Sequence, residues 1–143
     1  MAKRKKSTVA QEVEKAAKLL QRLVRLKASD DNGYCQCVTC GKIDHYKNMQ
    51  GGHFYSRRHT VFKLFEENIH VQCPACNQWG MKTTKIQEAY RIYMEDVYGV
   101  RRIRAMQRLA WRASPKFNRD EVIAFQRDLN ERIQDEVFRI GDY

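Results

Sequence analysis

Four cysteines in two pairs of identical spacing are the residues of this chain best placed to bind a metal ion. Cys37 and Cys40 form one C-x-x-C pair, Cys73 and Cys76 form the other, and residues 41–72 separate them. Two intervening residues let the backbone curl so that both thiolates reach one ion, and structural zinc takes four such ligands in a tetrahedron. The spacing therefore predicts a structural zinc ion held by all four cysteines.

The fifth cysteine, Cys35, is left over. It could replace Cys37 as a ligand, but the C-x-x-C register favours Cys37, so we expect Cys35 to be a buried thiol. An odd cysteine count argues against a framework of disulfide bonds. A redox role for either pair would need a thioredoxin-like strand–helix–strand pattern, which the sequence lacks.

The segments around the cysteines change character along the chain. Thr8-x-x-Gln11 is a capping box that predicts a helix from Thr8 to the turn formers at residues 29–33. Residues 34–72 lose the helical period and predict short strands and loops. A helix is expected again after Asn77, closed by Gly99. Its apolar stripe consists of Ile86, Ala89, Tyr90, Tyr93, Met94 and Val97.

Two more helices are expected in the C-terminal part. One covers Val100–Ala113 and is stopped by Ser114-Pro115, and the last begins at Asn118, where Asn118-x-x-Glu121 is a capping box. The last helix is expected to bury Val122, Phe125, Leu129, Ile133 and Val137. The helix before it carries arginines on one face, which is either a solvated face or a stripe that follows DNA phosphates. These arginines are Arg101, Arg104, Arg108 and Arg112.

Charge points to a polyanionic partner. The 143-residue chain has a formal net charge of +10, which favours nucleic acid. Residues 118–143 carry four arginines against seven acids, so the positive excess belongs to residues 1–117. Lys3, Arg4, Lys5 and Lys6 form a basic arm that is either solvated or in contact with phosphates. No apolar run is long enough to span a bilayer, so we expect a cytoplasmic protein that does not enter a membrane.

Between the cysteine pairs the sequence resembles a known family. G-G-H-F-Y-S-R-R-H at residues 51–59 and E-E-N-I-H-V-Q-C-P-A-C-N at residues 66–77 are similar to the HNH endonucleases. More closely, they resemble the phage recombination protein family called NinG or Rap, over roughly residues 35–99. The resemblance implies a ββα-metal fold and structure-specific cleavage of branched DNA, including Holliday junctions, in a bacterial host cell.

The resemblance also assigns roles. His53 matches the general base, and a neutral imidazole can take a proton from water. Asn77 matches a metal ligand of the family. Its amide oxygen is a donor that suits Mg²⁺ or Mn²⁺. Asn68 matches the middle Asn of the motif, which would tie the loop to the backbone near His53. These three residues are the expected catalytic set.

One position departs from the pattern. Many HNH enzymes have an Asp or His before the catalytic His that also binds the metal, whereas this chain has Gly52. Glu66 and His70 are the candidates to supply the missing ligand, with His59 behind them. Arg57 and Arg58 follow His53, and we expect them to clamp backbone phosphates together with Lys82 and Lys85.

We therefore expect an α+β fold with a zinc-knuckle-stabilised ββα-metal (HNH, or His-Me finger) centre and flanking N- and C-terminal helices. The divisions are a basic arm and helix at 1–33, a nuclease core at 34–99 and helices at 100–143. The expected function is metal-dependent DNA endonuclease action on branched recombination intermediates, by a homodimer because two strands must be cut. The alternatives are a zinc-knuckle DNA-binding protein without catalysis and an HNH nuclease that nicks ordinary duplex.

Overall fold

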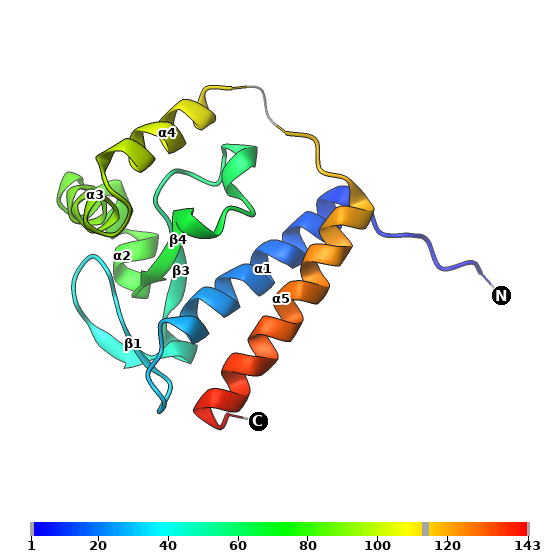
Figure 1. Ribbon diagram of the computed structural model, residues 1–143, viewed down its shortest axis with the longest axis horizontal. Coiled ribbons are helices and arrows are strands. Elements are labelled where there is room, and N and C mark those ends of the chain that lie inside the picture. The colour runs from blue at the N-terminus through cyan, green and yellow to red at the C-terminus, as the bar shows by residue number, and fades with distance from the viewer. Residues whose placement is uncertain (1, 113–114, 143) are drawn as a thin grey trace.

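Two small hairpins and a set of flanking helices make up the chain, as seen in a computed structural model that describes residues 2–112 and 115–142 (Figure 1). The first hairpin pairs β1 (Tyr34–Gln36) with β2 (Ile43–His45), and the second pairs β3 (Gln50–His53) with β4 (Ile69–Gln72). Both are antiparallel. The mixed α+β class expected from the sequence is confirmed.

A short helix follows the second hairpin directly. Helix α2 (Pro74–Gln78) begins with Pro at its first position, where the missing N–H costs no hydrogen bond. A single 3₁₀ turn, η4 (Gly80–Lys82), separates it from α3 (Thr84–Tyr98). The helical region therefore begins at Pro74, whereas the sequence predicted that it begins after Asn77. Asn77 of α2 donates a hydrogen bond to Gln50 of β3, so the two ends of the 50–78 segment lie close together.

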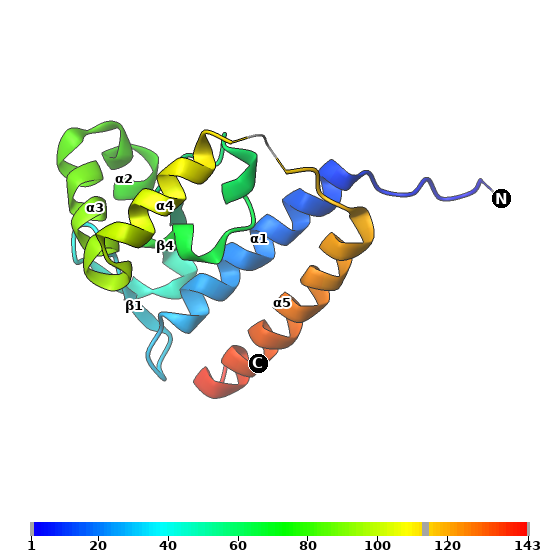
Figure 2. The same ribbon diagram turned by 45° about the horizontal axis from the view of Figure 1, so that its top comes forward.

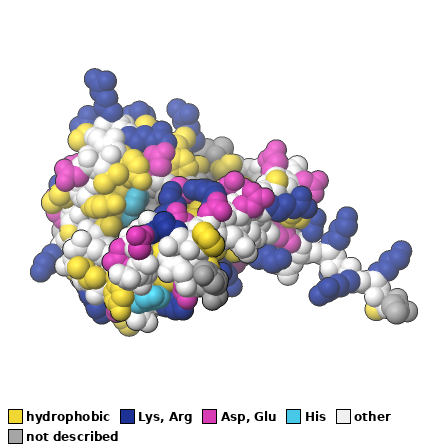
Figure 3. All heavy atoms as spheres, turned by 60° about the horizontal axis from the view of Figure 1, so that its bottom comes forward, with side chains coloured by type: hydrophobic (Ala, Val, Ile, Leu, Met, Phe, Trp, Pro, Cys, Tyr) yellow, Lys and Arg dark blue, Asp and Glu magenta, His cyan; other side chains and the backbone are white. Residues whose placement is uncertain are grey.

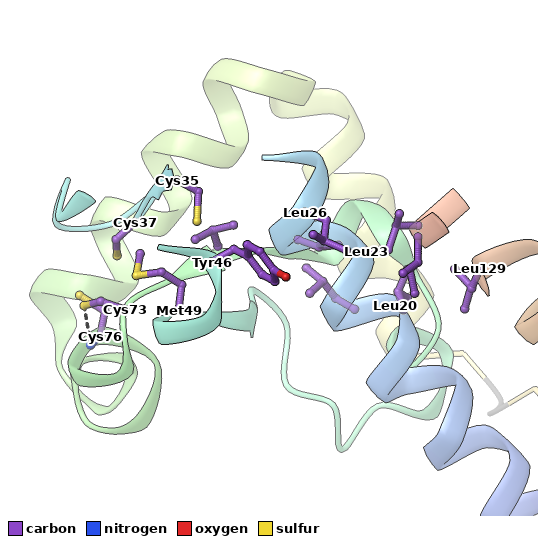
Figure 4. Packing of buried hydrophobic residues seen from close by; sticks show 14 residues of the cluster. Leu20, Leu23, Leu26, Cys35, Cys37, Tyr46, Met49, Cys73, Cys76 and Leu129 are labelled. Atoms are coloured by element: carbon purple, nitrogen blue, oxygen red, sulfur yellow. Dashed lines mark hydrogen bonds between the residues drawn. The ribbon is translucent and has the colours of Figure 1, made fainter. Parts of the chain in front are cut away.

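Long helices α1 (Val9–Lys27) and α5 (Arg119–Ile140) lie side by side on one side of the hairpins (Figures 1 and 2). The predicted capping box is present at Thr8, and Asn118 caps α5 by accepting from the backbone N–H groups of Asp120 and Glu121. The core cluster between these helices and the hairpin contains Leu20, Leu23, Leu26, Ile69, Val71, Leu129 and Ile133 (Figure 4). Phe125 and Val137, predicted to be buried, are only partly covered.

A second core cluster attaches the remaining helices. Tyr90 and Met94 of α3 pack with Ile103 and Met106 of α4 (Val100–Ala110) around the buried Phe62. Val97, expected in the apolar stripe of α3, is 52% exposed, because the stripe ends before the turn to α4. Helix α4 also ends at Ala110, earlier than predicted; Ala113 and Ser114 lie outside the described residues.

Residues 46–68 contain three single 3₁₀ turns and no α-helix, in agreement with the predicted strands and loops. These turns are η1 (Tyr46–Asn48), η2 (Thr60–Phe62) and η3 (Glu66–Asn68). The N-terminal arm extends away from the body, and its basic side chains stand clear of it in Figure 3. None of the helices in the described part of the chain is long and apolar enough to cross a membrane.

Candidate metal centre and active site

The four paired cysteines meet at one point. The Sγ atoms of Cys37, Cys40, Cys73 and Cys76 all lie within 4.8 Å of one another, and those of Cys40 and Cys73 are 3.7 Å apart. Zinc–sulfur bonds of about 2.3 Å in a tetrahedron place sulfur atoms about 3.8 Å apart. The four thiols therefore fit a zinc ion without rearrangement of the backbone.

Each pair sits in a local structure that turns its thiols inward. The first lies in the turn of the β1–β2 hairpin, where Gly41 adopts φ +80° and donates its N–H to the carbonyl of Cys37. The second caps α2, where Cys73 Sγ accepts from the N–H of Cys76. The N–H of Val38 bonds to the carbonyl of Val71 at 2.9 Å and joins the first turn to β4.

Cys35 lies outside this cluster, as expected. It is 4% exposed, and burial raises the pKa of its thiol. Figure 4 shows its sulfur apart from those of Cys73 and Cys76. By contrast, although burial opposes ionisation of Cys37, hydrogen bonds from Thr39 and from backbone N–H groups lower the pKa of Cys37 to about 6. A thiolate is the form that binds metal.

A buried glutamine connects the cysteine cluster to the strand that carries His53. The Thr39 hydroxyl lies 3.3 Å from Cys37 Sγ, and Gln72 Nε2 donates to that hydroxyl at 3.1 Å. Gln72 is fully buried, and its Oε1 has no hydrogen-bond partner in the described residues. A Cβ atom at position 52 would lie 1.8 Å from this Oε1. Any side chain at position 52, a metal-binding one included, would therefore require the buried Gln72 side chain to move.

His53 and Asn77 line the same hollow, of about 630 Å³. His53 ends β3 and pairs with Ile69, while Asn77 projects from α2. Burial, together with the positive charge of Arg57, lowers the pKa of His53 to about 4. The imidazole is therefore neutral at physiological pH and able to accept a proton. Within the described residues its ring nitrogens have no hydrogen-bond partner.

The amide of Asn77 is oriented by a neighbour on β3. Its Nδ2 donates to Oε1 of Gln50 at 2.8 Å. This bond uses the nitrogen end of the amide, and no described donor binds its Oδ1. The oxygen end is the one that coordinates hard cations. The hollow thus contains a neutral base and an uncommitted oxygen donor.

Asn68 holds the loop after His53. It is fully buried, its Oδ1 accepts from the N–H of Tyr55 at 2.8 Å, and its Nδ2 donates to the carbonyl of Tyr55 at 2.9 Å. The N–H of Phe54 also bonds to the Asn68 carbonyl at 2.9 Å. Because Phe54 and Tyr55 line the hollow, Asn68 fixes its wall and does not enter it.

Glu66 and His70 are not brought to this hollow. They line a different one, of about 580 Å³. The Glu66 carboxylate pairs with Lys27 at 3.3 Å and Arg132 at 2.7 Å. Nε2 of His70 lies 2.8 Å from the Tyr98 hydroxyl. His59, further back in the prediction, is exposed and packs edge-on against Phe62.

The carboxylate that shares the hollow with His53 is Glu88 of α3. Thr84, Gln87, Glu88 and Arg91 all line the hollow and lie at helical spacing i, i+3, i+4 and i+7. Among the described residues of the lining, Glu88 is the acidic one. The polar spacing puts these four residues on one face of α3, but the sequence does not indicate which face of the helix meets the hollow.

The predicted DNA-binding cations differ in their partners. Arg57 pairs with Glu14 of α1 at 2.8 Å. Arg58, Lys82, Lys85 and the four arginines 101, 104, 108 and 112 are exposed and form no ion pair with any described acid. Arg102, which is off that arginine face, pairs with both oxygens of Glu67 at 2.8 Å. The arginines of this face therefore remain available to bind a partner, whereas the charge of Arg102 is already paired with Glu67.

The fold and the cysteine cluster define a small mixed α+β protein with a four-cysteine site that can hold zinc, built around a strand–strand–helix segment. Its family is shown by sequence: residues 1–136 match the family described as bacteriophage lambda NinG protein, and the chain belongs to it. Membership supports a phage origin and a recombination-related role. No curated protein and no solved structure gives a significant match.

Proposed function

We propose that this protein is an HNH-type, metal-dependent DNA endonuclease that acts on branched recombination intermediates such as Holliday junctions, in the cytoplasm of the bacterial host. The single observation that carries the chemistry is the shared hollow of His53 and Asn77. The family supports a role in recombination, and the charge of +10 supports DNA as the partner.

In this proposal His53 is the general base. Its lowered pKa keeps the imidazole neutral, and the ring, whose nitrogens bind none of the described residues, lines a hollow large enough for water and a phosphate. Arg57, beside His53, would bind a phosphate oxygen. Asn68 positions the loop that forms the wall.

The residues that would hold Mg²⁺ or Mn²⁺ are Asn77, through Oδ1, and Glu88, whose two carboxylate oxygens are paired with Arg91 and would exchange that pairing for the ion. A carboxylate and an amide oxygen are ligands that these hard cations prefer. The bound cation would supply positive charge to the scissile phosphate. Glu66 and His70 line the other hollow and are not needed in this arrangement.

The decisive experiment compares His53→Ala with His59→Ala, a matched change at an exposed histidine of the adjacent loop. We expect His53→Ala to lower the cleavage rate of a labelled four-way junction in Mg²⁺ by about 10²- to 10⁴-fold, with DNA affinity measured without added Mg²⁺ or Mn²⁺ unchanged. His59→Ala should cut at the wild-type rate. An unaltered rate in His53→Ala would refute the assigned base.

The substrate is tested with a panel of linear, Y-shaped and four-way DNAs. Preferential cutting of the branched forms supports the proposal, whereas equal cutting of linear duplex would show an ordinary nicking enzyme. Binding without any cutting would show a zinc-knuckle DNA-binding protein. Because two strands of a junction must be cut, we also propose a homodimer, which sedimentation of the protein–junction complex would measure.

A further inference from the structure

The most exposed aromatic side chain in the described part of the protein lies at the end of a basic helix. Trp111 caps the C-terminus of α4 and is 82% exposed. An indole is the largest apolar side chain, and proteins usually cover most of it. Its backbone is still αR (φ −91°, ψ −3°), so the side chain projects as the helix repeat dictates.

That repeat puts Trp111 on the arginine face. Arg104, Arg108 and Trp111 are spaced i, i+4 and i+7, so they share one side of α4. The opposite side packs into the core through Ile103 and Met106. We call Arg101, Arg104, Arg108 and Trp111 the outer face of α4; Figure 1 shows this helix along the upper edge of the molecule.

The positive charges of the outer face favour a polyanion as its binding partner. Its three arginines have no acidic partner in the described residues, while Arg102 on the flank of the same helix is fully paired with Glu67. A second copy of the chain would fit poorly, because a two-fold interface brings the same patch against itself and would oppose like charges.

We propose that the outer face of α4 binds DNA at unpaired bases, with Trp111 stacking on an exposed base and the arginines holding the flanking phosphates. The bases of an intact duplex stack on each other and leave no face free, whereas a fork or branch point exposes them. The proposal rests on DNA as the partner, as in the proposed function, and adds the feature of branched DNA that the protein reads.

The chain's composition provides a direct test, because its two tryptophans are Trp79 and Trp111. In a Trp79→Phe background, Trp111 is the only indole reporter. The protein is titrated without added Mg²⁺ or Mn²⁺, so that cleavage is prevented, with a fork that has unpaired arms and with a fully paired duplex of equal length. We expect quenching of Trp111 fluorescence by the fork and much less by the duplex.

Affinity measurements with labelled DNA complete the test. Trp111→Leu should weaken fork binding roughly 5- to 140-fold, the range for one stacked base, and leave duplex binding nearly unchanged. Arg104→Gln should weaken both and reduce the salt dependence by about one ion. Arg102→Gln is the matched control, checked for folding by circular dichroism, and should bind as wild type.

Three results would overturn the proposal. Equal quenching by fork and duplex would mean that unpaired bases are not read, and fork binding without quenching would mean that Trp111 is not in contact. A concentration-dependent blue shift without DNA would show that a second copy covers the face. Failure of the proposed nuclease is distinguishable, since it would appear as absent cleavage in Mg²⁺ with this binding behaviour intact.

Discussion

His53 and His70 belong to the same hairpin and have the same pKa, about 4, but their surroundings are opposite. The Tyr90 hydroxyl donates its single proton to the Gly52 carbonyl at 2.7 Å, so at its 3.4 Å separation from His70 Nδ1 it can only accept. His70 Nε2 then accepts from Tyr98. Both nitrogens of His70 are used, whereas those of His53 face a hollow without a described partner.

This difference shows why a lowered pKa does not by itself identify a catalytic histidine. Burial is the main cause of both shifts. What separates the two residues is whether the ring nitrogens can reach a substrate. His70 joins β4 to α3 through hydrogen bonds at both ring nitrogens, to Tyr90 and Tyr98, and the Tyr90 hydroxyl also binds the Gly52 carbonyl. His53, one residue further, is free to act.

The largest effect is expected from removing the zinc site next to the hairpin that carries both histidines. Cys73→Ser should abolish zinc binding and lower the free energy of unfolding by several kcal/mol or more, since structural zinc contributes on the order of 10 kcal/mol in small domains. Metal content and thermal unfolding measure this. Cys35→Ser, a buried cysteine outside the cluster, should retain zinc; loss of zinc there instead would reassign the fourth ligand.

A smaller effect is expected at Gly52, which precedes His53 on β3 and pairs with His70 on β4. Gly52→Ala should destabilise the protein by about 1–3 kcal/mol or more, because its Cβ collides with Gln72. Denaturant unfolding measures the loss, and adding Gln72→Ala should recover part of it in a double-mutant cycle. Additive effects of the two changes would show that the predicted collision does not occur.

Acid should destabilise the folded protein through both histidines. Because the folded-state pKa of about 4 lies below the unfolded value of about 6.5, the unfolded state binds more protons between these values. The stabilisation that comes from the neutral histidines is therefore fully present above about pH 6.5 and is lost as the pH falls. Linkage gives a loss of up to about 2 kcal/mol per histidine between pH 7 and pH 5. Denaturant unfolding at both pH values measures it.

The substitution His70→Phe separates the contribution of His70 to the acid sensitivity from that of His53. It should remove about half of this acid sensitivity while costing about 1–3 kcal/mol at pH 7, because Tyr98 loses its buried partner. At a temperature where the variant is folded, DNA cleavage should remain near the wild-type rate. An unchanged acid sensitivity would mean that the pKa of His70 does not differ between the folded and the unfolded protein.

Much of the cysteine site could be predicted from sequence, because C-x-x-C spacing is a local property that survives any arrangement of the rest. Helix starts at Thr8 and Asn118 were predictable for the same reason. The position of His70 was not. A strand would have put it on the same face as Asn68, but Asn68 belongs to a 3₁₀ turn and β4 begins only at Ile69, so the alternation does not extend that far.

Glu88 was missed because its place depends on tertiary structure. Helix α3 begins after a 3₁₀ turn whose direction sets which of its faces meets the hollow. Glu66 was misplaced for a similar reason, since its partners Lys27 and Arg132 lie on α1 and α5, far away in sequence. Long-range ion pairs of this kind leave no periodic signal.

The smallest test concerns the charge beside His53. Arg57 pairs with Glu14, and both side chains are nearly half exposed, so Glu14→Gln should change the free energy of unfolding by less than about 1 kcal/mol. The same change releases Arg57 and should strengthen DNA binding and steepen its salt dependence by about one ion. Arg57→Gln should do the reverse. If Glu14→Gln leaves DNA affinity unaltered while Arg57→Gln also has no effect, phosphate does not reach Arg57, and the His53 hollow must be entered from another side.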